Sequence, residues 1–346
     1  MKRVSVNGTV LAPDKRRAWR MFAALAFISF SAILVACAVG SISLSPGDVL
    51  RALADRFSGN PSTVNSTVLG LRLTRALSAF GVGAMLSLAG VLMQALLRNP
   101  LADPYVLGVS GGASAGALTA MLLFGAGWAV DASAFGGALA VAALLFAFAH
   151  RDLRNGAGEA SASLLLLTGV VIASGCGALV TLMLSVAPDA RLRGMVFWLI
   201  GDLSDAQPYV LPWLLLSVAL LYAVFRARAI NLLAMHADAA ATLGVSVGML
   251  RRGLFFCAAL LTAGAVATAG SIGFVGLIVP HACRFIFGPD HRLLIPAATL
   301  TGGAFLVAAD TLARTVVAPQ QLPVGVVTAM IGVPVFLFQL HHVRRR

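Results

Sequence analysis

The chain has 346 residues, of which 59% are hydrophobic and only 11% carry a charge. A soluble domain averages about 25% charged residues, so this composition excludes an ordinary soluble protein and indicates one embedded in a membrane. The formal net charge of +12 would suggest a nucleic-acid partner for a soluble protein. Here it follows the membrane topology described below, and we expect no nucleic acid to bind.

Ten apolar runs follow one another along the chain, most of them long enough to cross a bilayer. The first, from about Trp19 to Gly40, is longer than the apolar core of an ordinary signal peptide, so we expect a retained helix. Closely spaced glycines in later runs, such as Gly83 and Gly90, predict tight packing between helices. We expect the spanning helices at residues 19–40, 72–97, 105–125, 128–149, 162–186, 209–226, 253–270, 274–287, 293–316 and 323–341.

The predicted fold class is therefore an all-α polytopic membrane protein with about ten transmembrane helices. One transmembrane domain, 19–341, lies between a basic N-terminal tail, 1–18, and a basic C-terminal tail, 342–346. Most lysines and arginines fall in the tails and in loops on the same side, so the positive-inside rule places both termini in the cytoplasm. We expect a multi-pass protein surrounded by the lipid bilayer.

A polar turn separates the second and third predicted spans. Pro100 and Pro104 can end one helix and allow the next to start, and Asp103 is favourable near a helix N-terminus. With Asn99 they form the segment "RNPLADP". We expect this turn to be architectural, with a direct contact to a transported substrate as the alternative.

The longest inner segment, about 227–252, contains the stretch "MHADAAATLG". It is rich in alanine, with Asp238 near its start and Gly244 at its end, which predicts a short helix stopped by glycine. That helix would lie on the cytoplasmic face and is too short and polar to span the bilayer. It is well placed to meet a soluble partner.

The sequence offers no catalytic or metal centre. Ser110 stands in a G-x-S-x-G stretch, but that motif needs a preceding strand, and here it opens an apolar run. The lysines, Lys2 and Lys15, lie outside any glycine loop, so the chain has no Walker A motif. The four cysteines are far apart and form no CxxC pair, which indicates packing residues. We therefore predict neither an enzyme nor a bound metal or cofactor.

One acidic residue, Asp310, lies well inside a predicted span, and Arg314 follows one helical turn later. The spacing allows the two side chains to pair, which leaves little for a proton relay. An ATP-independent secondary transporter or channel remains an alternative to the ATP-driven importer described next.

Several segments together resemble the FecCD family of permeases. The first is "RLTRALSAFGVGAMLSLAGVLMQALLRNPLADPYVLGVSGGASAGAL", and another is "GSIGFVGLIVPHACRFIFGPDHRLLIPA". The matching segments occupy residues 72–118, 196–204, 241–252, 270–297 and 309–340. They occur in order along nearly the whole chain.

The resemblance implies a permease fold like that of the vitamin B12 importer, with ten helices. Such permeases belong to binding-protein-dependent ABC importers for iron–siderophores, haem and vitamin B12. The resemblance also implies a location in the bacterial inner membrane and a homodimer or pseudo-dimer around a central pathway. Its implied partners are two copies of a separate ABC ATPase that uses ATP and Mg²⁺, and a periplasmic or lipoprotein substrate-binding protein. This subunit itself would bind no cofactor.

The resemblance also assigns three arginines to docking of the binding protein. They are Arg72, Arg75 and Arg314, in the family's R-L-P-R and "ADTLAR" positions, with Thr74 in place of proline. The alternative is that these side chains merely extend to the membrane interface.

The coupling helix that meets the ATPase is expected at the segment that ends in the family's A-x-x-L-G pattern. At the start of this segment the family pattern has glycine and glutamate, whereas this chain has His236 and Ala237. The expected coupling residues are His236, Asp238, Ala240, Leu243 and Gly244.

A cytoplasmic gate is expected near Ser161 and Ser163, where the fifth span begins. Small polar residues suit a surface that opens and closes. Helix N-capping explains the same residues equally well.

Overall fold

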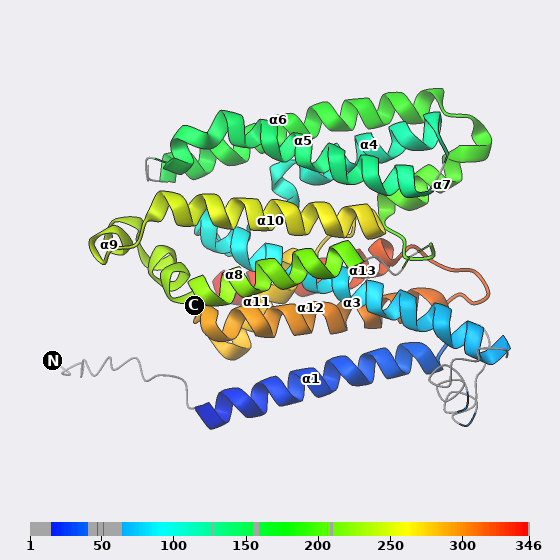
Figure 1. Ribbon diagram of the computed structural model, residues 1–346, viewed down its shortest axis with the longest axis horizontal. Coiled ribbons are helices and arrows are strands. Elements are labelled where there is room, and N and C mark those ends of the chain that lie inside the picture. The colour runs from blue at the N-terminus through cyan, green and yellow to red at the C-terminus, as the bar shows by residue number, and fades with distance from the viewer. Residues whose placement is uncertain are drawn as a thin grey trace.

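The computed structural model describes residues 15–40, 47, 51, 64–125, 127–154, 159–205, 207 and 210–344. Every regular element within these ranges is a helix (Figure 1). The helices are α1 Lys15–Ala38, α3 Val64–Leu97, the 3-10 helix η1 Pro104–Leu107, α4 Val109–Leu123, α5 Gly127–Arg154, α6 Glu159–Val186, α7 Asp189–Ile200, α8 Val210–Met235, α9 Ala237–Thr242, α10 Val247–Ala269, α11 Val275–Phe287, α12 His291–Thr315 and α13 Val324–Arg344.

Ten of the described helices are apolar enough to form the membrane domain. Seven of them, α1, α3, α5, α6, α8, α10 and α12, are also long enough to cross a bilayer unaided. The other three, α4, α11 and α13, are shorter apolar helices. The predicted all-α polytopic architecture with about ten spanning segments is thereby confirmed.

The helices form a bundle with two distinct ends. Figure 1 shows α9, the start of α1 and the C-terminus at one end, which we call the α9 end. The end of α1, the start of α3, and α7 lie at the other, which we call the α7 end. Sites at these two ends are therefore separated by roughly the thickness of the membrane domain.

Helix α3 is the centre of the bundle. It has 34 residues, and 89% of the residues in its most apolar 18-residue stretch are buried. It packs most extensively against α12 and α10, and also against α11, α8 and α1. A helix that is apolar on all sides is expected to lie in the interior, as α3 does.

Glycines bring α3 into direct backbone contact with its neighbours. A Cβ atom at Gly83 would collide with the carbonyl oxygen of Gly302 on α12, and one at Gly90 would collide with that of Gly276 on α11. Ser87 lies between these crossings and donates a hydrogen bond of 2.8 Å to the carbonyl of Ala298. The close packing expected of the closely spaced glycines is present at these crossings.

Several elements differ from the sequence-based expectation. Helix α3 begins at Val64, before the predicted start at 72, and α10 begins at Val247, before the predicted start at 253. Helix α8 continues to Met235, beyond the predicted end at 226, so only residues 236–246 connect it to α10 outside those two helices. The Arg226 guanidinium lies 6.0 Å from the centroid of the Tyr222 ring, which accommodates its charge on the helix surface. The short helix α7 was not expected at all.

Candidate functional site

A buried carboxylate joins two arginines at the α7 end of the bundle. Asp310 is 1% exposed. Arg75 donates to both of its oxygens, with Nη2 at 2.8 Å and Nε at 3.0 Å from Oδ1, and Nε at 3.1 Å from Oδ2. Arg314 Nε lies 3.1 Å from Oδ2. The pairing of Asp310 with Arg314 expected from their spacing is confirmed, and Arg75 joins it from α3.

Two arginines of this region also hold the end of α1. Arg72 Nη1 lies 3.1 Å from the carbonyl oxygens of both Cys37 and Ala38, and Arg314 Nη2 lies 3.2 Å from that of Ala36. The last carbonyls of a helix have no partner within the helix and carry partial negative charge. Arg72 and Arg314 therefore act as a C-terminal cap for α1.

The three arginines predicted to dock a binding protein thus gather at one end of the molecule, where all three are largely buried and the Arg75 side chain is 11% exposed. Arg72 and Arg314 are 7% and 5% exposed. Arg75 Nη1 donates a 2.8 Å hydrogen bond to Oε1 of Gln321, which is exposed. Among the three, Arg75 reaches furthest toward the surface.

The short helix predicted at the opposite end is present as α9. His236 precedes it in an extended conformation, Asp238 lies in its first turn, and Gly244 follows it with a φ of 83°. Only glycine adopts that conformation without cost. Leu243 is 66% exposed, so α9 ends in an apolar side chain that faces outward next to the connecting segment.

Hydrogen bonds join the end of α8, just before α9, to the start of α12. Asn231 on α8 donates to Asp290 Oδ1 at 2.7 Å, and its own Oδ1 accepts from the His291 backbone N at 2.8 Å. Asp290 in turn caps α12 by accepting from the Arg292 backbone N at 3.0 Å. Helix α12 therefore reaches from the base of the α9 segment to the arginine cluster at the α7 end.

The polar turn before α4 is held by side-chain hydrogen bonds. Asn99 Oδ1 accepts from the Leu101 backbone N at 2.9 Å, and Asp103 Oδ1 accepts from the Tyr105 backbone N at 2.8 Å. The Tyr105 hydroxyl accepts from the Ile272 backbone N at 3.1 Å. Burial raises the pKa of Asp103 to about 6, against the opposing effect of its hydrogen bond.

Prolines complete this turn. Pro104 is the first residue of η1, where a missing N–H costs nothing, and its ring packs where a side chain on Gly276 would otherwise lie. Pro100 lies between α3 and η1. These contacts support the architectural role expected for the turn.

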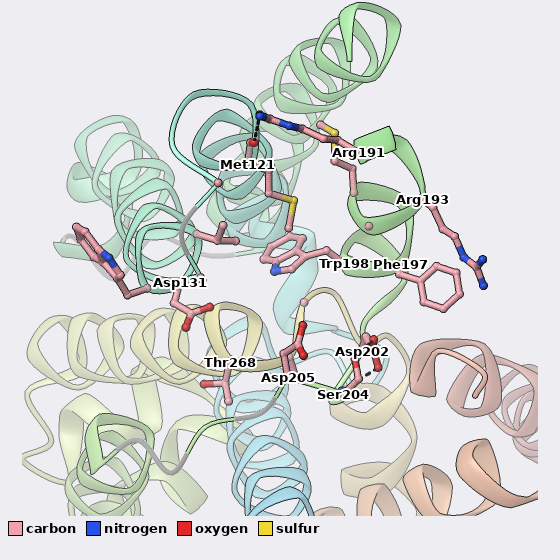
Figure 2. Close-up of a pocket in the computed structure, with 18 of the residues that line it drawn as sticks. Met121, Asp131, Arg191, Arg193, Phe197, Trp198, Asp202, Ser204, Asp205 and Thr268 are labelled. Carbon is pink, nitrogen blue, oxygen red and sulfur yellow. Dashed lines mark hydrogen bonds between the residues drawn. The ribbon is translucent and has the colours of Figure 1, made fainter. Parts of the chain in front are cut away.

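A cavity of about 1340 Å³ opens at the α7 end between α4, α5, α7, α10 and the segment after α7. Figure 2 shows the side chains of Met121 and Trp198 pointing into it, with Asp131, Asp202 and Asp205 along one side. The lining is mixed, since apolar side chains face these carboxylates.

Arg191 fixes α7 beside this cavity. Its Nη1 donates to the carbonyls of Met121 and Leu122, at 2.7 and 2.8 Å, and so caps the end of α4 (Figure 2). On another face of α7, the Arg193 guanidinium lies 5.4 Å from the centroid of the Phe197 ring. Helix α7 is thus a short element attached to the bundle at the mouth of the cavity.

Comparison with known proteins places this architecture in a family. The profile of the FecCD transport family matches residues 26–342. The chain belongs to the FecCD transport family. It is a multi-pass membrane permease, and in systems of this family the ATPase is a separate subunit, as the sequence motifs implied.

FecCD relatives cover nearly the full length of the chain. It is 42% identical to the cobalamin import system permease protein BtuC of Halobacterium salinarum, over 82% of this chain and 75% of the relative. It is 36% identical to the vitamin B12 import system permease protein BtuC of Escherichia coli, over 97% of this chain and 99% of the relative.

Two solved structures are similar to this chain in fold. An inward-facing structure described as a metal-chelate type ABC transporter superposes with a TM-score of 0.80 at 27% identity, covering 93% of this chain and 99% of that one. PsaBC from Streptococcus pneumoniae, in complex with Fab, superposes with a TM-score of 0.55 at 17% identity, covering 83% and 94% of the two chains, and is similar in fold alone.

The expected gate of this FecCD permease lies near the start of α6. Ser161 and Ser163 belong to that helix, but their side chains fall outside the part of the chain that the structure describes. Their role stays a prediction.

Sequence reasoning missed several features of this FecCD chain that contribute to its sites, among them α7 and the contacts of Asn231. Helix α7 was hidden in a polar connection, although Pro188 before it and Gly201 after it, with a φ of 94°, mark its ends. The hydrogen bonds of Asn231 with Asp290 and His291, which we call the Asn231 clamp, join residues about 60 positions apart. No local sequence pattern signals such a contact.

Proposed function

We propose that this FecCD permease carries a cobalamin across the bacterial inner membrane as part of an ABC importer. The observation that supports it is the 36% identity to a vitamin B12 permease over 97% of this chain, together with 42% identity to a cobalamin permease. Haem and ferric siderophores are the competing cargoes, because the wider family was expected to include permeases for them.

The proposed orientation places the α9 end in the cytoplasm and the α7 end in the periplasm. Both termini would then be cytoplasmic, and the basic residues near them would obey the positive-inside rule. The proposed assembly contains two copies of this chain around a central pathway and two copies of the ATPase.

Each end of the bundle would bind a different partner protein. A substrate-binding protein would dock at the α7 end, where Arg72, Arg75 and Arg314 gather, and release its cargo toward the pathway. The ATPase would dock at α9, with His236, Asp238, Ala240, Leu243 and Gly244 as the proposed contact region. ATP binding and hydrolysis by the partner would move α9 and switch the pathway between its outward-open and inward-open states.

Uptake into proteoliposomes tests this function. Vesicles would contain this permease and its ATPase, with ATP inside and the binding protein outside, loaded in turn with cobalamin, haem or a ferric siderophore. We expect accumulation of cobalamin that requires both ATP and the binding protein. Accumulation of another cargo alone would overturn the substrate, and flux without ATP would overturn the importer in favour of a carrier or channel.

A further inference from the structure

Two guanidinium groups at the α7 end, those of Arg75 and Arg314, share one carboxylate. With Arg72 they gather around this carboxylate, that of Asp310, and the last carbonyls of α1. Carbonyls carry only partial negative charge, so Arg75 and Arg314 together leave an excess of positive charge beside the Asp310 carboxylate. An excess of this sign favours an additional carboxylate from outside.

Asp310 cannot contact that partner itself. It is 1% exposed, and both of its oxygens already accept from Arg75. Its position fixes the Arg75 guanidinium instead, because Nε and Nη2 are both directed at the carboxylate in the two-point geometry that arginine forms best. The remaining corner of the guanidinium, Nη1, is directed away from Asp310.

That outer corner is covered by a neutral group. Arg75 Nη1 donates to Oε1 of Gln321 at 2.8 Å, and Gln321 is exposed in the segment between α12 and α13. An amide oxygen is a weaker acceptor for a guanidinium than a carboxylate oxygen. A carboxylate that approached from outside would therefore replace it favourably.

We propose that Asp310 is a positioning residue that holds the Arg75 guanidinium with Nη1 outward, and that the Gln321 amide oxygen is a placeholder at the position that a carboxylate of the binding protein takes on docking. The inference rests on the proposed function and deepens it by naming how the docking arginine is presented. Arg72 and Arg314, which cap α1, supply charge behind it.

The test is a pair of single substitutions. Gln321→Glu places a permanent carboxylate on Arg75 Nη1, whereas Gln320→Glu adds the same charge one residue away at an exposed position. Affinity of the cargo-loaded binding protein would be measured for the permease–ATPase complex in nanodiscs. We expect Gln321→Glu to weaken binding at least about tenfold and Gln320→Glu to change it less than threefold.

Equal affinities for the two variants would overturn the proposal. Absence of binding to the wild-type complex would instead overturn the proposed function, so the two failures are distinguishable. Gln321→Ala removes the placeholder without adding charge, and we expect binding as strong as wild type or stronger. Weaker binding by this variant would contradict the placeholder role.

Testing the role of Asp310 requires variants that distinguish its positioning of the Arg75 guanidinium from its negative charge. Asp310→Asn removes the inner carboxylate, and Asp310→Asn combined with Gln321→Glu restores the charge on the outer side of Arg75. We expect the double variant to regain thermal stability while its binding stays at least tenfold weak. Recovery of binding together with stability would show that Asp310 only balances charge. If neither variant folds, the pair at 320 and 321 decides the proposal.

Discussion

Asp103 gives the turn between α3 and α4 a predictable pH dependence. Burial raises its pKa from the usual 3.8 to about 6, so the native protein binds this proton more tightly than the unfolded chain does. Stability contributed by this group is therefore lost as the pH rises through about 6 and regained on acidification. Between pH 7.5 and pH 5.0 the gain is about 1.4 kcal/mol.

The variant Asp103→Asn isolates this effect. Its amide oxygen can still accept from the Tyr105 backbone N, but it does not ionise. Thermal unfolding in detergent at both pH values should show wild type gaining a few degrees at pH 5.0 relative to the variant. The same pH dependence in both proteins would contradict the assignment to Asp103.

Single residues also show where sequence reasoning stops. The pairing of Asp310 with Arg314 could be predicted because four residues separate them on one helix. The stronger contact of Asp310, with Arg75, joins positions 235 residues apart and depends on how α3 packs against α12. Capping of α1 by Arg72 was equally hidden, because nothing local marks an arginine that serves a distant helix end.

Among the helices, the crossing of α3 and α11 sets a strict limit on side-chain size. We expect Gly90→Ala to destabilise the protein by about 3 kcal/mol or more, because the added Cβ would collide with the backbone carbonyl of Gly276, which cannot move aside alone. The control is Gly136→Ala on α5, which has open space around it. Thermal unfolding of the two variants should separate them clearly, and similar melting temperatures would contradict the packing argument.

The clamp at Asn231 is a second element-scale contact that can be tested. Asn231→Leu would leave the Asp290 side chain and the His291 backbone N without the hydrogen bonds that they make across to α8. We expect a loss of about 1–3 kcal/mol in stability, since these hydrogen bonds are partly buried and one of them is to a carboxylate. Unchanged thermal unfolding of this variant would show that the clamp adds nothing to the attachment of α12.

The helices themselves were largely predictable from hydropathy, because the bilayer demands long apolar runs with internally satisfied backbones. The ends of the helices were less predictable. Helix α8 continues past the predicted end at 226 and includes Arg226 and Arg228, since long cationic side chains extend to water from a helical backbone. Helix α7 escaped because its 12 residues are too few to span the membrane.

At the scale of the whole molecule, the proposed function predicts that binding at one end of the bundle can be impaired without affecting binding at the other end. Leu243 presents an exposed apolar side chain beside α9, as an ATPase-docking surface would. Leu243→Asp should weaken association with the ATPase and abolish ATP-dependent cobalamin uptake, whereas Leu243→Met should retain both. Affinity for the binding protein should stay within about twofold of wild type, because that protein docks at the opposite end.

Gln321→Glu should give the reverse pattern, with weak docking of the binding protein and normal association with the ATPase. Co-purification of the ATPase and nanodisc binding of the cargo-loaded binding protein would measure the two properties on the same preparations. If Leu243→Asp weakened both associations, either the substitution would have disrupted the fold or the two surfaces would not be distinct. Thermal unfolding decides between these, since a folded variant that lost both partners would contradict the assignment of one partner to each end.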